Sequence, residues 1–135
     1  MTTQKTITVD DSKIDLCFFR ISGVSVAFDA GLVSEFLSQD EEARSIQTVD
    51  VGQRLGLDAR SKETLCQKAL VNRADQQFLL LLGPKIRIES VEISMLHRLP
   101  PIVKAIEGST GICGIVRRRD DFAYLLDIDS LVGCQ

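Results

Sequence analysis

The chain has 135 residues, of which 44% are hydrophobic and 26% charged, and its formal net charge is -3. These values are typical of one globular domain with a hydrophobic core. The negative charge and the few aromatic residues (six Phe, one Tyr, no Trp) argue against a nucleic-acid surface. Since no apolar run reaches the length of a membrane span and the N-terminus lacks a secretion signal, the expected compartment is the cytoplasm.

Several stretches are predicted to lie outside the regular β-structure. Residues 1–13 are polar and are expected to be a flexible N-terminus ahead of a single domain, residues 14–135. Gln39–Ser45 is an acidic loop, and residues 58–67 form a polar connector. A helical turn is predicted at Val103–Glu107, after a pair of prolines.

The domain begins with a predicted β-hairpin. Ile14–Ile21 is apolar on both faces, and Val24–Phe28 alternates between apolar and polar residues. Ser22 and Gly23 supply the turn between them. The following stretch, Ala30–Leu37, fits the spacing of a helix and that of a strand equally well.

A strand followed by a short helix is predicted in the middle of the chain, at Ile46–Leu57. Asp50 can cap the helix N-terminus, with Gln53 three residues later as a weak capping-box partner. Gly56 supplies the left-handed residue that ends such a helix.

The same device closes the chain. Phe122–Leu126 is a buried strand, Asp127 a helix cap and Gly133 the stop, and in both copies the glycine lies six positions after the aspartate. This repetition predicts two related lobes. Ile112–Val116 is expected to pair with Phe122–Leu126 in a hairpin. The R-R-R-D-D sequence between them, residues 117–121, is predicted to be a solvated turn.

Another hairpin is predicted between these two copies. Lys68–Val71 pairs with Phe78–Leu82, whose apolar side chains on both faces indicate a central strand. Ile86–Glu89 alternates and predicts an exposed edge strand. Short strands with turn signals between them indicate an all-β barrel or sandwich.

The residues that could carry catalysis or bind a metal are scattered. The only histidine, His97, stands beside Arg98 and is expected to be a surface residue. We therefore predict no catalytic residue, metal or cofactor, and a small thiol- or metal-dependent enzyme remains only as an alternative. The cysteines form no C-x-x-C pair and are expected to be structural thiols: Cys17, Cys66, Cys113 and Cys134.

Two motifs and their order resemble the CheW-like family of chemotaxis coupling proteins, over roughly residues 14–132. They are T-V-D-V-G-Q-R-L-G-L, residues 48–57, and G-I-C-G-I-V-R-R-R-D-D-F-A-Y-L-L-D-I-D-S-L-V, residues 111–132. The positions that match the family pattern are Val49, Asp50, Val51, Arg54, Leu55, Gly56, Gly111, Gly114, Leu125, Leu126, Asp127 and Leu131.

The resemblance implies a mostly β fold with two small SH3-like β-barrel lobes around a shared hydrophobic core. It implies no enzymatic activity. The implied partners are the cytoplasmic tip of a methyl-accepting chemoreceptor, the regulatory domain of a histidine kinase and other CheW-like proteins. Neither nucleic acid nor membrane insertion is implied.

The chain departs from the family ahead of its first motif. Family members carry a longer segment there, ending in Asn-Leu-Arg-Gly, whereas this sequence has the acidic run Asp40–Ala43. A shortening of this size removes a strand and a loop. We therefore expect one lobe to be reduced, or its sheet to have an open edge.

The resemblance also gives the expected protein-binding residues. Asp29–Phe36 aligns without gaps with the family strand that faces the receptor, which makes Val33, Glu35 and Phe36 the expected contacts. The alternative is that Val33 and Leu37 are core residues and Glu35 is solvated. The predicted function is a non-enzymatic adaptor that keeps one of the two partner interfaces, and the alternative is a standard coupler that bridges receptor and kinase.

Overall fold

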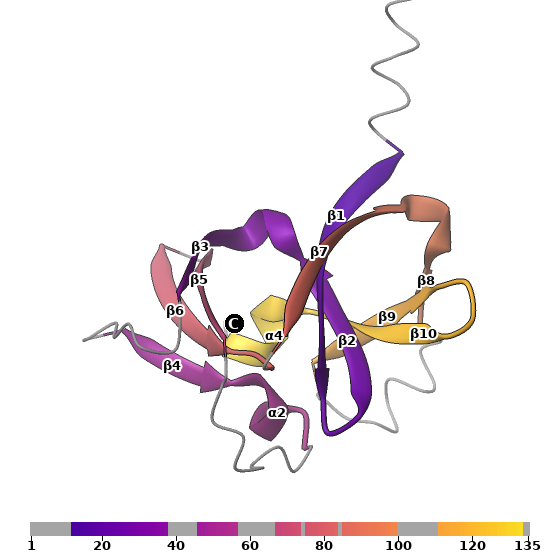
Figure 1. Ribbon diagram of the computed structural model, residues 1–135. Coiled ribbons are helices and arrows are strands. Elements are labelled where there is room, and N and C mark those ends of the chain that lie inside the picture. Colours follow the sequence, from indigo (N-terminus) through magenta and orange to yellow (C-terminus); the bar gives the residue numbers. More distant parts are fainter. Residues whose placement is uncertain are drawn as a thin grey trace, which may run out of the picture.

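The computed structural model describes residues 12–37, 46–56, 67–73, 75–83, 85–99 and 111–133 (Figure 1). Within these residues the strands are β1 (Lys13–Ile21), β2 (Val24–Asp29), β3 (Val33–Leu37), β4 (Gln47–Asp50), β5 (Lys68–Arg73), β6 (Gln76–Leu81), β7 (Ile86–Glu92), β8 (Leu96–Arg98), β9 (Ile112–Arg117) and β10 (Phe122–Leu126). The helices are the short 3-10 turns η1 (Ala30–Leu32) and η2 (Ile93–Met95), and the α-helices α2 (Val51–Arg54) and α4 (Ile128–Val132).

The strands form two sheets. Sheet A has the order β7-β1-β2-β10-β9-β8, and sheet B has the order β3-β5-β6-β4. Each sheet contains one parallel pair, β2 with β10 and β4 with β6, and its other neighbours are antiparallel. The three predicted hairpins are all present, β6 is a central strand as expected, and β7 is an edge strand.

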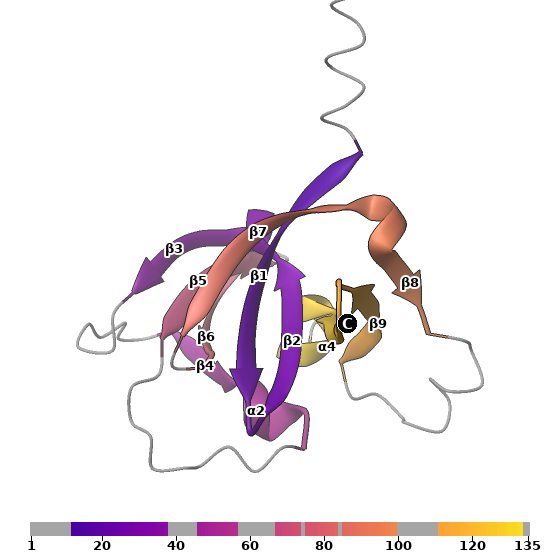
Figure 2. The same ribbon diagram turned by 45° about the vertical axis from the view of Figure 1, so that its right-hand side comes forward.

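The two sheets share a common plan. In each sheet, an outer strand (β7 or β3) pairs with the first strand of a hairpin (β1–β2 or β5–β6). The second strand of that hairpin runs parallel to a strand (β10 or β4) that is followed by a capped helix. The strand after each hairpin crosses to the opposite sheet, because β3 pairs with β5 and β7 pairs with β1 (Figure 2). The predicted two-lobed repeat is therefore a pair of interlocked units, each contributing one strand to the other.

Sheet B is the smaller of the two. Sheet A continues from β10 to β9 and β8, whereas sheet B ends at β4, the counterpart of β10. Among the described residues, no strand pairs with the outer edge of β4. This is the kind of open edge that the shortened sequence ahead of β4 led us to expect.

The largest hydrophobic cluster, here called the central core, lies between the sheets. It takes side chains from both sheets and both α-helices: Cys17, Phe19, Ile21, Val26, Phe28, Val49, Val51, Ala69, Val71, Phe78, Leu80, Leu82, Leu126, Ile128, Leu131 and Val132. The predicted core residues Phe28, Leu80 and Leu82 are at most 5% exposed. The implied arrangement of two lobes around a shared core is therefore present.

A smaller cluster lies on the other face of each sheet. Sheet A carries a cluster of five buried residues, Leu16, Phe18, Ala27, Val116 and Ala123. Sheet B carries one of three, Leu37, Leu70 and Leu79. The described part of sheet B thus has fewer strands and a smaller second cluster.

Both predicted helix caps are present. Asp50 accepts a hydrogen bond from the Gln53 backbone N–H at 3.3 Å, and Asp127 accepts one from the Asp129 N–H at 3.1 Å. Gly56 and Gly133 follow with φ of +80° and +81°, the left-handed backbone that glycine adopts without strain.

Ala30–Leu37, which fits helix and strand spacing equally well, contains both: η1 occupies its first three residues and β3 the rest. Strand β1 begins at Lys13, one residue before the start predicted for the first strand. Lys13 pairs with Glu92, and the Ile93 N–H donates to the Ser12 carbonyl at 2.8 Å. The acidic loop and the helical turn at Val103–Glu107 lie outside the described residues, as does all of the polar connector except Gln67.

Candidate protein-interaction surface

Strand β3, which carries the expected contact residues, contains a bulge. Val33 pairs with Val71 of β5 and Glu35 with Leu70, so Ser34 is an extra residue without a cross-strand partner. The Ser34 hydroxyl donates a hydrogen bond to the Leu70 carbonyl at 3.2 Å. A side chain thus satisfies a backbone acceptor beside the irregular pairing.

The bulge changes which side chains share a face. Val33 lies opposite Val71, a central-core residue, whereas Glu35 lies opposite Leu70 on the other face of sheet B. Two of the expected contact residues, Val33 and Glu35, therefore lie on opposite faces of sheet B. A single inserted residue reverses the face of everything that follows it.

The exposed residues of β3 are Ser34, Glu35 and Phe36. Phe36 is 39% exposed, one of few large hydrophobic residues at the surface of the described structure. Val33 is half-buried against the central core, and Leu37 is buried with Leu70 and Leu79. The outer edge of β3 has no partner strand among the described residues, so a charged and an aromatic side chain stand beside free backbone groups.

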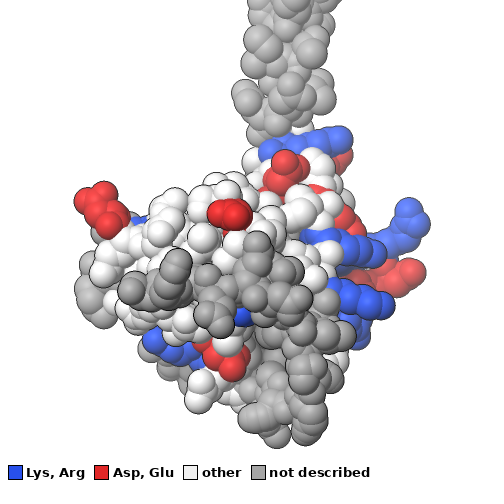
Figure 3. Space-filling model, turned by 60° about the vertical axis from the view of Figure 1, so that its left-hand side comes forward, with Lys and Arg blue, Asp and Glu red and all other residues white. Residues whose placement is uncertain are grey.

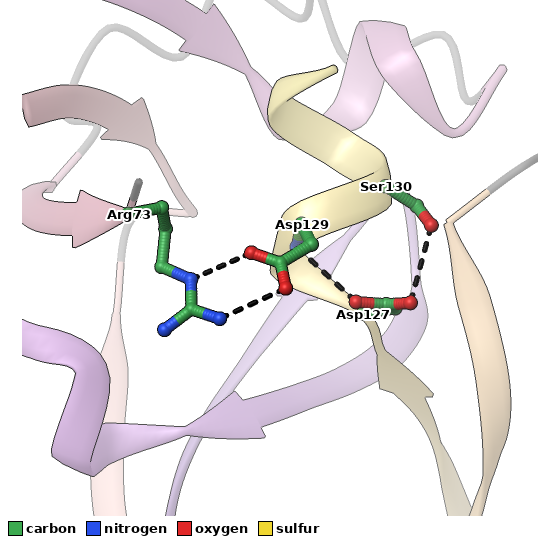
Figure 4. A network of polar contacts seen from close by, with 4 residues as sticks. All are labelled: Arg73, Asp127, Asp129 and Ser130. Atoms are coloured by element: carbon green, nitrogen blue, oxygen red, sulfur yellow. Dashed lines mark hydrogen bonds and ion pairs between the residues drawn. The ribbon is translucent and has the colours of Figure 1, made fainter. Parts of the chain in front are cut away.

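Helix α4 fastens the two lobes to each other at the central core. Arg73 of β5 makes two hydrogen bonds to Asp129, Nε to Oδ1 at 2.6 Å and Nη2 to Oδ2 at 2.8 Å (Figure 4). The Ser130 hydroxyl donates to the capping carboxylate of Asp127 at 3.1 Å. Arg54 of α2 donates through Nη1 to the Leu131 carbonyl. Two arginines from the sheet B side thus hold the helix that follows sheet A.

The paired guanidinium also changes the acidity of Asp129. The hydrogen bonds from Arg73 lower the pKa of the Asp129 carboxyl from its ordinary value. The two side chains remain 32% and 46% exposed, so solvent weakens their attraction. The pair therefore orients α4 more than it stabilises the fold.

The cysteines and the histidine do not assemble into a reactive site in the described residues. Cys17 is fully buried, and burial raises the pKa of its thiol to about 12, which keeps it protonated and unreactive. His97 is exposed, and Cys113 is half-buried. No group of three or more possible metal ligands occurs in this part of the chain, and Cys66 and Cys134 lie outside it.

The R-R-R-D-D turn differs from its predicted solvated state at one position. Arg117 and Arg119 are exposed, but the Arg118 side chain is only 26% exposed. Its guanidinium lies 4.1 Å from the centroid of the Phe18 ring and donates to Glu89 at 2.8 Å. The sequence holds no local signal for this contact, because Phe18 and Glu89 are distant along the chain.

The two interlocked β-units, the shared core and the paired capped helices define a CheW-like fold. A similar fold occurs in the crystal structure of the scaffolding protein TtCheW from Thermoanaerobacter tengcongensis, with a TM-score of 0.68 at 16% sequence identity. The similarity covers 84% of this chain and 88% of that one. The predicted fold class is confirmed.

The sequence matches no family model and no curated protein. In the described residues, no helix is long and apolar enough to cross a membrane.

Proposed function

We propose that this chain is a non-enzymatic adaptor of a chemotaxis-like signalling system in the cytoplasm. The observation that carries the proposal is the similarity of its fold to that of a scaffolding protein over most of both chains. The described residues also offer exposed strand edges, which suit a docking role, and no cluster of possible metal ligands.

The adaptor is proposed to be a reduced coupler that keeps one partner interface. The smaller sheet B and the unpaired outer edge of β4 in the described structure support this form. The retained partner is proposed to be the cytoplasmic tip of a methyl-accepting chemoreceptor, bound at β3 through Glu35 and Phe36. The regulatory domain of the histidine kinase is the partner that is lost.

Binding to each partner measured separately by isothermal titration calorimetry tests this proposal. The reduced coupler binds the receptor tip and not the kinase domain, whereas a standard coupler binds both. Binding of the kinase domain alone reverses the assignment, and binding of neither contradicts the adaptor function. Catalytic turnover of a substrate, or stoichiometric zinc in the purified protein, would favour the enzyme alternative.

The β3 interface is tested by the variants Glu35→Arg and Phe36→Ser. Both side chains are exposed, so the fold should survive while receptor affinity falls. Gln76→Arg is the control, since Gln76 is also exposed in sheet B but lies on β6. Val33→Lys is a poorer probe, because Val33 packs against the central core and its loss would destabilise the protein. Normal receptor binding by both β3 variants would place the interface elsewhere.

A further inference from the structure

A groove of about 1090 Å³ lies in the other lobe, on the face of sheet A that carries the smaller cluster. Phe18 and Val116 form its floor and are at most 5% exposed. Its walls come from β7 and from the β9–β10 hairpin, and β7, η2 and β8 arch over that hairpin (Figure 1). Because β7 and β8 are the outermost strands of sheet A and do not pair, the sheet curls without closing.

The groove is basic although the chain is acidic. Its described lining includes six Lys or Arg residues and four Asp or Glu residues, whereas the whole chain has 16 basic and 19 acidic residues. One of the four carboxylates, Glu89, is already engaged by both Arg87 and Arg118. Figure 3 shows several Lys and Arg side chains at the right-hand edge of the molecule, with Asp and Glu side chains among them.

Four of the lining cations have no acidic partner in the described structure. One of them, Arg20 of β1, donates a hydrogen bond to the Gly23 carbonyl at 3.2 Å. The other three come from different elements: Lys85 precedes β7, Arg117 ends β9, and Arg119 lies in the turn after it. Charges that point inward from an edge strand often serve only to prevent sheet aggregation. That explanation suits Arg87 and Glu89 on β7, but not three unpaired cations that lie outside the edge strand.

Two further features suit an extended ligand. The outer edge of β7 has no partner strand among the described residues, so its backbone groups can pair with an added strand. Met95 lines the same groove and is 41% exposed, which adds an apolar contact at its η2 end. An incoming strand would meet cations on one side and an unpaired backbone on the other.

We propose that this groove binds an extended acidic peptide segment of a partner protein, through its carboxylates to Lys85, Arg117 and Arg119. The argument is charge complementarity at an unpaired strand edge. This surface lies on sheet A and is distinct from β3 of sheet B, so it is a second docking site beyond the proposed function.

The probe is a fluorescein-labelled ten-residue peptide of alternating Glu and Val, and its binding to the full chain is followed by fluorescence anisotropy. The matched ligand is the same peptide with Lys in place of Glu. We expect the acidic peptide to bind and the basic one not to bind, with affinity falling as salt is raised. Absence of acidic-peptide binding at low salt, or equal binding of both peptides, would overturn the proposal.

The site is tested with two double variants of equal charge change. Arg117→Glu with Arg119→Glu should weaken acidic-peptide binding by about tenfold or more. Lys13→Glu with Arg98→Glu, at exposed positions outside the groove, should weaken it by less than about twofold, a screened long-range effect. Circular dichroism verifies that both variants fold. If both double variants weaken peptide binding equally, the effect comes from the net charge of the protein, and the proposed site is refuted.

Other occupants give different results. If the wild type self-associates in sedimentation and the groove variant does not, while the peptide fails to bind, the occupant is a second copy and the proposal is wrong. Full displacement of the peptide by millimolar inorganic phosphate would make the site one for small anions. Glu35→Arg should leave peptide binding unchanged, which separates this test from that of β3.

Discussion

At the scale of single residues, Arg118 shows how one side chain in a charged turn can differ from its neighbours. The sequence predicts a solvated turn whose neutralisation changes stability by no more than about 0.5 kcal/mol. In the structure, Arg118 covers Phe18 and pairs with Glu89, whereas Arg117 and Arg119 are exposed. Of the three arginines in this turn, only Arg118 contradicts the prediction of solvated side chains.

We expect Arg118→Ala to lower the free energy of unfolding by about 1–2 kcal/mol, since it removes a cation–π contact and a charged hydrogen bond. Arg117→Ala and Arg119→Ala are the controls and should each cost less than about 0.5 kcal/mol. Urea denaturation measures all three. Equal losses at the three positions would contradict the special position of Arg118.

The Arg73–Asp129 pair predicts a dependence of stability on pH. Because the folded state lowers the pKa of Asp129, the pair stabilises the protein above the unfolded pKa, about 3.9, and this contribution is lost as the pH falls through the folded value. The exposed pair should contribute no more than about 1 kcal/mol. Wild type and Asp129→Asn should therefore differ in unfolding free energy at pH 7, and this difference should shrink as the pH falls below about 4.

The control for this experiment is Asp75→Asn, an exposed turn carboxyl with no ion pair in the described structure. Comparison with the wild type at each pH cancels the titration of all the shared carboxyls. A difference between wild type and Asp129→Asn that stays constant from pH 7 to pH 3 would show that the charge of Asp129 does not matter.

At the scale of elements, the sequence predicts those that depend on local signals. The hairpins follow from alternation and turn residues, and the capped helices from an aspartate and a glycine at fixed spacing. It does not predict the strand β8, the parallel pairing of β4 with β6, or the crossing of β3 and β7 between sheets. These depend on contacts between distant segments, which leave no local pattern.

The candidate interface illustrates the same limit. Exposure of Glu35 agrees with the sequence pattern, but the bulge at Ser34 could not be predicted from it, because V-S-E-F-L fits the spacing of a helix as well as that of a strand and does not show where the register shifts. Only the register with β5 shows that Val33 faces the central core.

The two capped helices should differ in sensitivity. Asp50→Ala and Asp127→Ala should each cost about 1 kcal/mol in unfolding free energy. Asp127 should cost more, because it accepts a 3.1 Å bond from Asp129 and another from Ser130, whereas Asp50 accepts one at 3.3 Å. Thermal melts of both variants give the comparison, and Asp→Asn at each site is the control that keeps the capping oxygen. A larger loss at Asp50 would contradict this ranking.

At the scale of the whole molecule, the interlocked strands define where the domain begins. Removal of residues 2–11 should leave the melting temperature unchanged, because this stretch precedes β1 and is mostly polar in sequence. Removal of residues 2–15 should lower it, since the bond from Ile93 to Ser12 and the first pairs of β1 with β7 are lost. If the shorter deletion is equally harmful, the domain extends further towards the N-terminus.

The strand exchange also predicts that the two lobes unfold together. Leu80 of β6 and Tyr124 of β10 lie in different sheets, yet both pack in or against the central core. Tyr124 is the only tyrosine and the chain has no tryptophan, so tyrosine fluorescence reports on sheet A, while far-UV circular dichroism reports on both sheets. Since each lobe holds a strand of the other unit, neither can unfold alone without breaking its neighbour's pairing.

Leu80→Ala should therefore lower the unfolding free energy by about 2–5 kcal/mol, the cost of truncating a fully buried leucine, and by the same amount in both signals. Gln77→Ala, at an exposed position of the same strand, should move neither transition. If the fluorescence midpoint stays at its wild-type value while the circular dichroism curve splits, sheet A folds independently and the central core does not couple the lobes. Coincident shifts would show that damage to sheet B is felt in sheet A across the shared core.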